Sequence, residues 1–135
     1  MNVLLVGDDA ALLEGLAQSF AALGYTPRVV LSLHEAREGA ISDPPLLAVV
    51  DSELAAEASA DALAIQLSPG GALVLYHGTP DERPIIPPTL QRAVMADLAL
   101  PLERNRLIAL AQRVSDRVRA TGRSRRQTPP EQQAF

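Results

Sequence analysis

With 135 residues, 47% of them hydrophobic and 21% charged, the chain has the length and composition of one globular domain and is too short for two domains of ordinary size. The absence of cysteine excludes disulfides, thiolate metal sites and cysteine nucleophiles, and no apolar run is long enough for a signal peptide or a membrane span, so we expect a cytoplasmic protein without a membrane partner. Residues 1–103 carry a net charge of −10 and residues 104–135 one of +6, but the basic segment lacks interleaved aromatic residues, so we do not expect this domain to bind nucleic acid.

Short apolar runs alternate with helical patterns along the chain. The runs with the length of strands lie at 3–6, 28–31, 46–50, 72–76 and 98–100. Apolar residues at helical spacing predict helices over 12–23, 33–42, 55–67 and 90–95, and a last helix from about 102 to 122. Regular alternation of strand and helix indicates a parallel sheet with helices on both faces and right-handed crossovers. We therefore predict a five-stranded, doubly wound α/β fold.

Polar residues, prolines and glycines mark the ends of these elements. Asp8 or Asp9 can cap the first helix, and Ser32 can cap the second. Four prolines between residues 80 and 88 predict an extended loop in place of part of a helix. Gly122 is expected to end the last helix, which divides the chain into a domain at 1–122 and a basic, polar tail or linker at 123–135 that we expect to be disordered.

The central apolar run ends in a charged residue. Residues 46–50 are apolar without a break, which suits a strand buried on both faces, and Asp51 follows them directly. A carboxylate at the C-terminal end of a central parallel strand faces the crevice where such sheets bind ligands. Helix capping is the alternative role for Asp8 and Asp9. It is a weaker alternative for Asp51, because Ser52 would serve as a cap equally well.

The residues at the ends of the first and third strands resemble those of response-regulator receiver domains. The resemblance is carried by Val-Leu-Leu-Val-Gly-Asp-Asp at 3–9 and Val-Val-Asp at 49–51, and it covers about residues 1–122. It implies a flavodoxin-like sheet of order 2-1-3-4-5, in which the first and third strands are neighbours. In that family the acidic residues after the first strand and the phosphoacceptor aspartate bind Mg²⁺. The resemblance thus implies Asp51 as the candidate phosphoacceptor, and as candidate Mg²⁺ ligands Asp8, Asp9, Asp51 and the backbone carbonyl of Glu53.

The switch positions of the family pattern are altered. Gly7 stands in the place of the first acidic residue. Tyr76 and His77 stand where the family has Ser or Thr at the end of the fourth strand, and Thr79 lies beyond a glycine. Leu100 occupies the place of the lysine after the fifth strand, although the following proline is kept. Because the chain contains no lysine, no other alignment restores this cation.

These departures predict a degenerate receiver, or pseudo-receiver, that acts in signal transduction as a protein-interaction module and not as an enzyme. A histidine kinase, an output domain or a second copy of the chain is the expected partner. Ile85 and Ile86 lie between prolines, where successive side chains of an extended segment point apart, so we expect at least one of them to be exposed on an interaction surface. The first alternative is a phosphoaccepting response regulator that is modified on Asp51 with Mg²⁺. The second is a small α/β enzyme, for which the sequence offers neither a glycine-rich phosphate loop nor a nucleophile–base pair.

Overall fold

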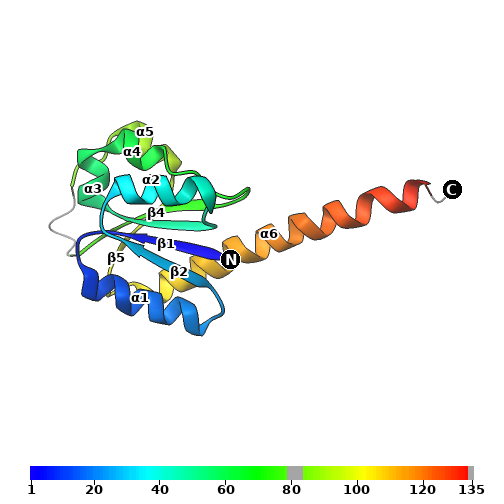
Figure 1. Cartoon of the computed structure of the whole chain (residues 1–135), viewed down its shortest axis with the longest axis horizontal. Coiled ribbons are helices and arrows are strands. Elements are labelled where there is room, and N and C mark those ends of the chain that lie inside the picture. The colour runs from blue at the N-terminus through cyan, green and yellow to red at the C-terminus, as the bar shows by residue number, and fades with distance from the viewer. Residues whose placement is uncertain (79–83, 134–135) are drawn as a thin grey trace.

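The computed structural model describes residues 1–78 and 84–133, excluding the side chains of residues 121–133. The described residues form a parallel five-stranded sheet of order β2-β1-β3-β4-β5 (Figure 1). This finding confirms the predicted fold class and strand order. The strands are β1 (Asn2–Val6), β2 (Thr26–Val30), β3 (Leu47–Asp51), β4 (Ala72–His77) and β5 (Val94–Ala99).

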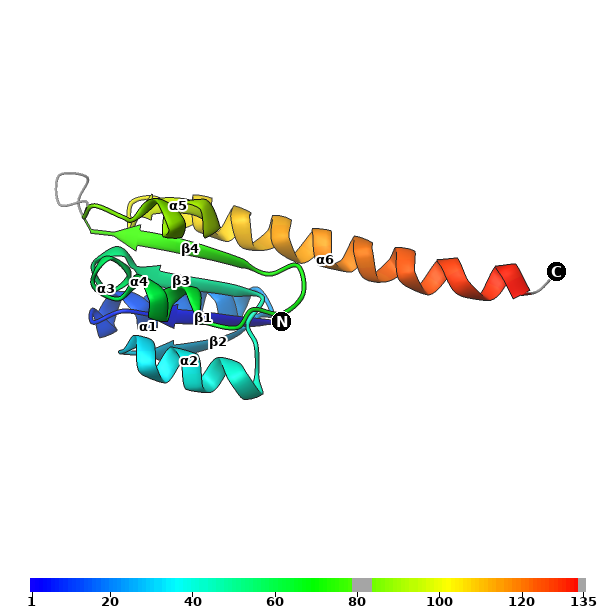
Figure 2. The ribbon, with the colours of Figure 1, turned by 90° about the horizontal axis from the view of Figure 1, so that it is seen from above.

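Helices cover both faces of the sheet. One face carries α1 (Ala10–Ala22) and α6 (Arg104–Gln133), and the other carries the shorter helices (Figures 1 and 2). Apolar side chains of the described residues form a separate core cluster on each face. The shorter helices are α2 (Leu33–Ser42), α3 (Ser52–Glu57), α4 (Ser59–Leu63) and α5 (Pro88–Ala93). None of the helices that the structure describes is long and apolar enough to cross a membrane.

The predicted caps account for two of the helix starts. The Asp9 side chain accepts a hydrogen bond from the Leu12 amide at 3.2 Å and so caps α1. The Ser32 hydroxyl accepts one from the Glu35 amide, also at 3.2 Å, and caps α2. A cap of this kind satisfies an amide that the first turn of a helix leaves without a partner. Of the two acidic residues proposed for the first cap, Asp9 therefore takes the role.

Three elements differ most from the prediction. The helix expected over 55–67 is interrupted at Ala58 and forms α3 and α4, and β5 begins four residues before the apolar run at 98–100. The expected end of the last helix at Gly122 is wrong, because α6 continues to Gln133 and projects beyond the sheet (Figure 2). A single glycine costs a helix only about 1 kcal/mol relative to alanine, and the arginines that follow favour helix. The domain boundary at 122 remains a prediction.

Candidate functional site

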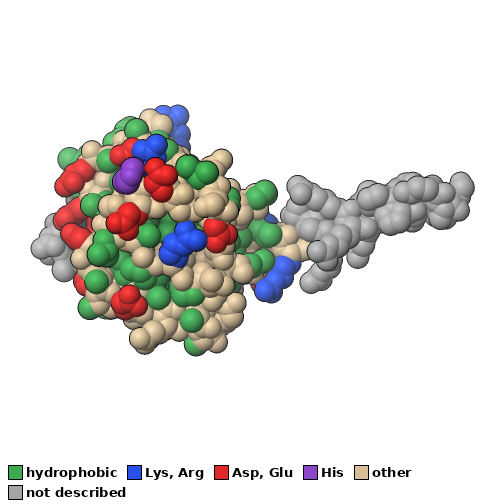
Figure 3. All heavy atoms as spheres, in the orientation of Figure 1, with side chains coloured by type: hydrophobic (Ala, Val, Ile, Leu, Met, Phe, Trp, Pro, Cys, Tyr) green, Lys and Arg blue, Asp and Glu red, His purple; other side chains and the backbone are tan. Residues whose placement is uncertain are grey.

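A hollow of about 670 Å³ opens at the edge of the sheet where β1, β3 and β4 end. We call it the acidic hollow. Acidic side chains gather on the side of the body away from the projecting part of α6 (Figure 3). The structure places most of the sequence-predicted site residues in this one hollow, whose lining includes Asp8, Asp9, Asp51, Glu53, Tyr76, His77 and Leu100. Parallel pairing of β1 with both β2 and β3 explains this arrangement, because it brings the carboxyl ends of neighbouring strands to one edge.

Asp51 is half-buried and caps a helix. Its Oδ1 accepts a hydrogen bond from the Glu53 amide at 2.8 Å, at the start of α3. Helix capping, the alternative role that the sequence analysis considered weaker for Asp51, is therefore confirmed, and Ser52 is the first residue inside the helix. Burial raises the pKa of Asp51, and the nearby charges of Asp8 and Glu53 raise it further, while the hydrogen bond from the Glu53 amide opposes them. The hollow thus holds a carboxylate at a free-energy cost.

Replacing Asp51 with asparagine is expected to stabilise the fold at pH 7. The folded-state pKa lies above the ordinary value of 3.8, so ionisation of Asp51 lowers stability as the pH rises from 3.8 through the folded-state pKa. The asparagine side chain would keep the Oδ1 acceptor of the cap and remove the charge. Thermal unfolding should show a higher Tm for Asp51→Asn at pH 7 and no gain below pH 3.8. An equal gain at both pH values would contradict this account of the charge.

Gly7 and Tyr76 fit together across the hollow. A Cβ added at Gly7 would overlap the Tyr76 Oη, and it would lie 3.2 Å from the ring Cζ and 3.5 Å from the Asp51 Cβ. The Tyr76 side chain therefore fills the space that a side chain at position 7 would need. Tyr76 is only 3% exposed, and its Oη has no hydrogen-bond partner among the described atoms.

The Tyr76 hydroxyl stays protonated in these surroundings. Burial raises the pKa of Tyr76 well above its ordinary value of 10, and the charges of Asp51, Asp8 and Asp9 add to the shift. The sequence marked Gly7 and Tyr76 as two separate departures and missed that one compensates for the other. The available signal was their position, since Tyr76 is paired with Asp51 across β3 and β4, and β1 lies on the other side of β3.

His77 and Leu100 complete the wall of the hollow. The His77 Nδ1 lies 2.9 Å from the Asp97 Oδ1, a contact between β4 and β5 that the sequence analysis did not predict. The Leu100 side chain is buried, with 1% exposed, in the place where the receiver pattern has a lysine. The last switch candidate, Thr79, lies outside the described residues. The described wall therefore presents an apolar group where the resemblance implies a cation.

The residues present do not fit the Mg²⁺ site that the resemblance implies. Within residues 1–78 and 84–120, no three His, Asp or Glu side chains form a group that could hold a metal ion. Asp9 and Asp51 each use a carboxylate oxygen as a helix cap. A third carboxylate at position 7 is excluded by the Tyr76 hydroxyl, which is a poorer ligand for a hard cation than a carboxylate.

The predicted pair Ile85 and Ile86 lies outside the acidic hollow and is split between surface and core. Ile85 is 94% exposed, whereas Ile86 is 7% exposed and packs in the core cluster under α2 and α5. The expectation that at least one of them is exposed is confirmed. The inclusion of Ile86 in an interaction surface is wrong, because its side chain points into the core.

Comparison with known proteins identifies the fold. Neither a family model nor a curated protein sequence matches the chain. Among solved structures, it is similar to the N-terminal domain of a response regulator/sensory box/GGDEF three-domain protein from Carboxydothermus hydrogenoformans, with a TM-score of 0.71 and 19% identity over 90% of this chain and 98% of that chain. It is also similar to the CheY-like receiver domain from Methylobacillus flagellatus, with a TM-score of 0.67 and 17% identity over 84% of this chain and 98% of that chain.

A third similar structure has a ligand in its description. The response regulator TrrA from Thermotoga maritima, in complex with Mg²⁺ and BeF, has a TM-score of 0.62 and 16% identity over 84% of this chain and 97% of that chain. At these identities the likeness shows the fold, which is that of a CheY-like receiver domain. The chemistry of the site depends on the residues of this chain.

Proposed function

We propose that this chain, which has the receiver-domain fold, is a signal-transduction module that acts by binding protein partners and not through a phosphorylation switch or as an enzyme. The observation that carries the proposal is the Tyr76 hydroxyl, which fills the space at Gly7 where the resemblance implies an acidic residue. Restoring an acidic side chain at Gly7 would require Tyr76 to move. The absence of an acidic side chain at position 7 is therefore coupled to the packing of Tyr76.

Two residues that would stabilise a phosphoryl group on Asp51 in the receiver pattern are replaced in this chain, and this supports the same proposal. Leu100 supplies no positive charge, and a hydrogen bond to a charged group contributes about 1.5–3 kcal/mol, so its loss weakens an acyl phosphate substantially. Tyr76 cannot replace the Ser or Thr of the receiver pattern by a small movement, because its side chain is buried in the core cluster and its hydroxyl lies against Gly7. The phosphoaccepting alternative retains one supporting observation, which is that Asp8 and Asp51 line the same hollow.

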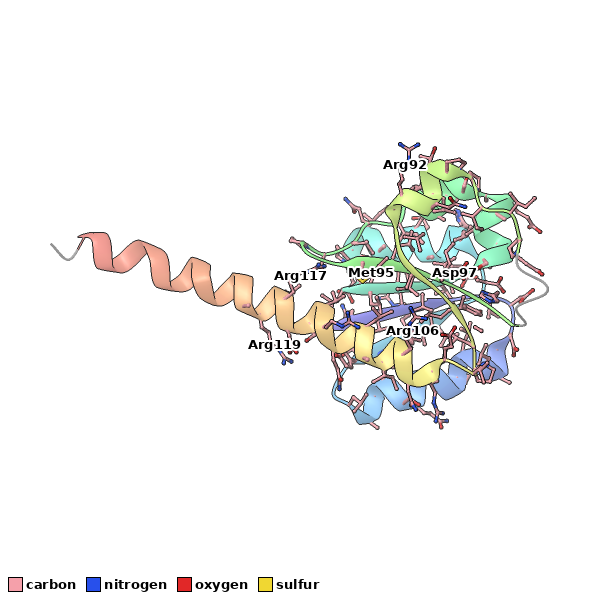
Figure 4. The ribbon with its side chains drawn as sticks, turned by 180° about the vertical axis from the view of Figure 1, so that it is seen from behind. Arg92, Met95, Asp97, Arg106, Arg117 and Arg119 are labelled. Carbon is pink, nitrogen blue, oxygen red and sulfur yellow. The ribbon has the colours of Figure 1, made fainter. Side chains whose placement is uncertain are left out.

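A surface beside the edge strand is suited to the proposed protein contact. Ile85 is 94% exposed and Met95 of β5 is 41% exposed. Figure 4 shows Met95 on β5, the strand at the edge of the sheet, between α5 and α6. A second hollow of about 530 Å³ is lined in part by Ile85, Gln91 and Ala96, the last of which follows Met95 in β5. Exposed apolar groups around a hollow often mark a contact site.

Magnesium is expected to have little effect on this protein. A ligand that binds only the folded state at 100 times its Kd adds about 2.7 kcal/mol to the free energy of unfolding. Because the carboxylates of the acidic hollow do not form a three-ligand group, we expect the Tm to be the same in EDTA and in excess Mg²⁺, with Ca²⁺ as a control for nonspecific ion effects. A Mg²⁺-specific rise in Tm that Asp8→Asn abolishes would favour the phosphoaccepting alternative.

A further inference from the structure

We propose that the acidic hollow binds the side chain of an arginine supplied by a protein partner. The inference rests on the proposed protein-binding function. It adds to the surface beside β5 a second contact, at the carboxyl edge of the sheet, in which carboxylates bind a guanidinium group. In this arrangement the cation that the chain lacks at Leu100 comes from the partner. Three features of the hollow suit this occupant: its negative charge, the Tyr76 hydroxyl and its apolar wall.

The negative charge of the hollow favours a positively charged occupant. Asp8, Asp51 and Glu53 all line it, and the first and last of these raise the pKa of Asp51 by like-charge repulsion. Of the described lining residues, His77 is the only one that can carry a positive charge, and its Nδ1 faces Asp97 of β5. A guanidinium group would relieve the repulsion among the carboxylates, and its planar set of N–H donors can reach several of them together.

The Tyr76 hydroxyl provides a second, independent indication of a ligand. Its oxygen is buried and has no hydrogen-bond partner within the described part of the chain, although a buried polar atom normally has one. The oxygen lies against Gly7, and Tyr76 lines the hollow together with Asp51. A guanidinium N–H that reaches this wall could donate to the phenol oxygen, while the phenol hydrogen remains available to a carboxylate.

The apolar part of the wall suits the stem of a long cationic side chain. Leu12, Leu100 and Pro101 line the hollow together with the carboxylates. Arginine buries its methylene groups against apolar surface and keeps its charged end with polar groups. The volume of about 670 Å³ lies within the range of binding sites for small groups, about 300–1,000 Å³. A bare metal ion would make no use of this apolar surface, which favours a side chain as the occupant.

Titration of the ¹⁵N-labelled full chain with the peptide acetyl-Gly-Arg-Gly-amide tests this inference. Amide shifts in the NMR spectrum should move for residues around the hollow, including Gly7, Glu53 and Gly78, and the binding should weaken at high salt. The same peptide with citrulline in place of arginine is the matched probe, because citrulline keeps the shape and removes the charge. We expect the citrulline peptide to leave these shifts unchanged.

Matched variants locate the binding. Asp51→Asn and Asp8→Asn are each expected to weaken the arginine peptide by about fivefold, the upper range for one partly exposed ion pair. Glu38→Gln, at an exposed acidic residue of α2, should leave the affinity unchanged. Equal shifts with the citrulline peptide, equal loss in Glu38→Gln, or shifts at the hollow with Mg²⁺ but not with the peptide would each overturn the inference. Failure of the arginine peptide to bind would also overturn the inference, but it would leave the Mg²⁺ test of the proposed function unaffected, so the two can fail separately.

Discussion

Replacing Gly7 with alanine is expected to destabilise the fold by about 1–3 kcal/mol, the usual cost of forcing an extra methyl group into a packed interior. The added Cβ would overlap the Tyr76 Oη, and the Tyr76 ring is held in the core with 3% of its surface exposed. Chemical denaturation at equilibrium measures the change. Gly15→Ala is the matched control, because a Cβ added at that helical position would meet no described heavy atom within 4 Å apart from its chain neighbours and the nearby backbone of its own helix. This control should stabilise the fold by about 0.4–1 kcal/mol.

A second substitution assigns the cost of Gly7→Ala to the hydroxyl. Tyr76→Phe removes the overlapping atom and leaves the ring Cζ 3.2 Å from the new Cβ, a contact that a small shift relieves. It also removes a buried oxygen without a described partner, so Tyr76→Phe alone should be neutral or stabilising by up to about 1 kcal/mol. In the Tyr76→Phe background, Gly7→Ala should lose at least about half of its cost. An unchanged cost would show that the two positions are independent and would remove the main support for the proposed function.

Ile86→Ala is expected to destabilise the fold by about 2–5 kcal/mol, as for other buried isoleucines. Ile86 is 7% exposed and packs in the same core cluster as Leu75 and Leu90. Its neighbour Ile85 is 94% exposed and provides the control, since Ile85→Ala should change stability by less than about 0.5 kcal/mol. Urea denaturation of both variants gives the comparison. If both substitutions cost the same, the two side chains would not be divided between core and surface.

Substitutions at Ile85 and Ile86 distinguish an effect on protein binding from an effect on stability. Because Ile85→Ala is expected to leave the fold intact, any protein contact that it weakens would depend on the exposed surface and not on unfolding. The corresponding change at Ile86 could not be interpreted in this way, since it alters the core. Ile85 is therefore the residue through which the proposed surface beside β5 should be tested.

The sequence predicted the layers and the strand order because apolar runs of strand length alternate with helical patterns, and because residues 3–9 and 49–51 resemble the receiver pattern. It predicted the wrong end for α6, since one glycine is a weak stop signal when three arginines and a glutamine follow within five residues. It could not tell which of Ile85 and Ile86 is buried, because period-two alternation says that neighbours point apart and not which of them faces the core.

The candidate site was predicted as a set of residues but not as a packed arrangement. Convergence of Asp8 and Asp51 follows from the order of parallel strands, and the structure places both in one hollow. The dependence of Tyr76 on Gly7 follows from side-chain volume across two strands, which no local pattern records. The contact of His77 with Asp97 likewise depends on the register of β4 and β5, which is irregular between Leu73 and Val74.

Mass spectrometry of the intact protein after incubation with acetyl phosphate and Mg²⁺ tests the central claim most directly. The proposed function predicts no lasting phosphoryl adduct. The hollow has Leu100 where the receiver pattern has a lysine, and the Tyr76 hydroxyl fills the space at Gly7 that a third carboxylate would need. A typical receiver domain, treated in parallel, would show that the phosphodonor is active. Stoichiometric, long-lived modification that is lost in Asp51→Asn would contradict the proposal and establish the phosphoaccepting alternative.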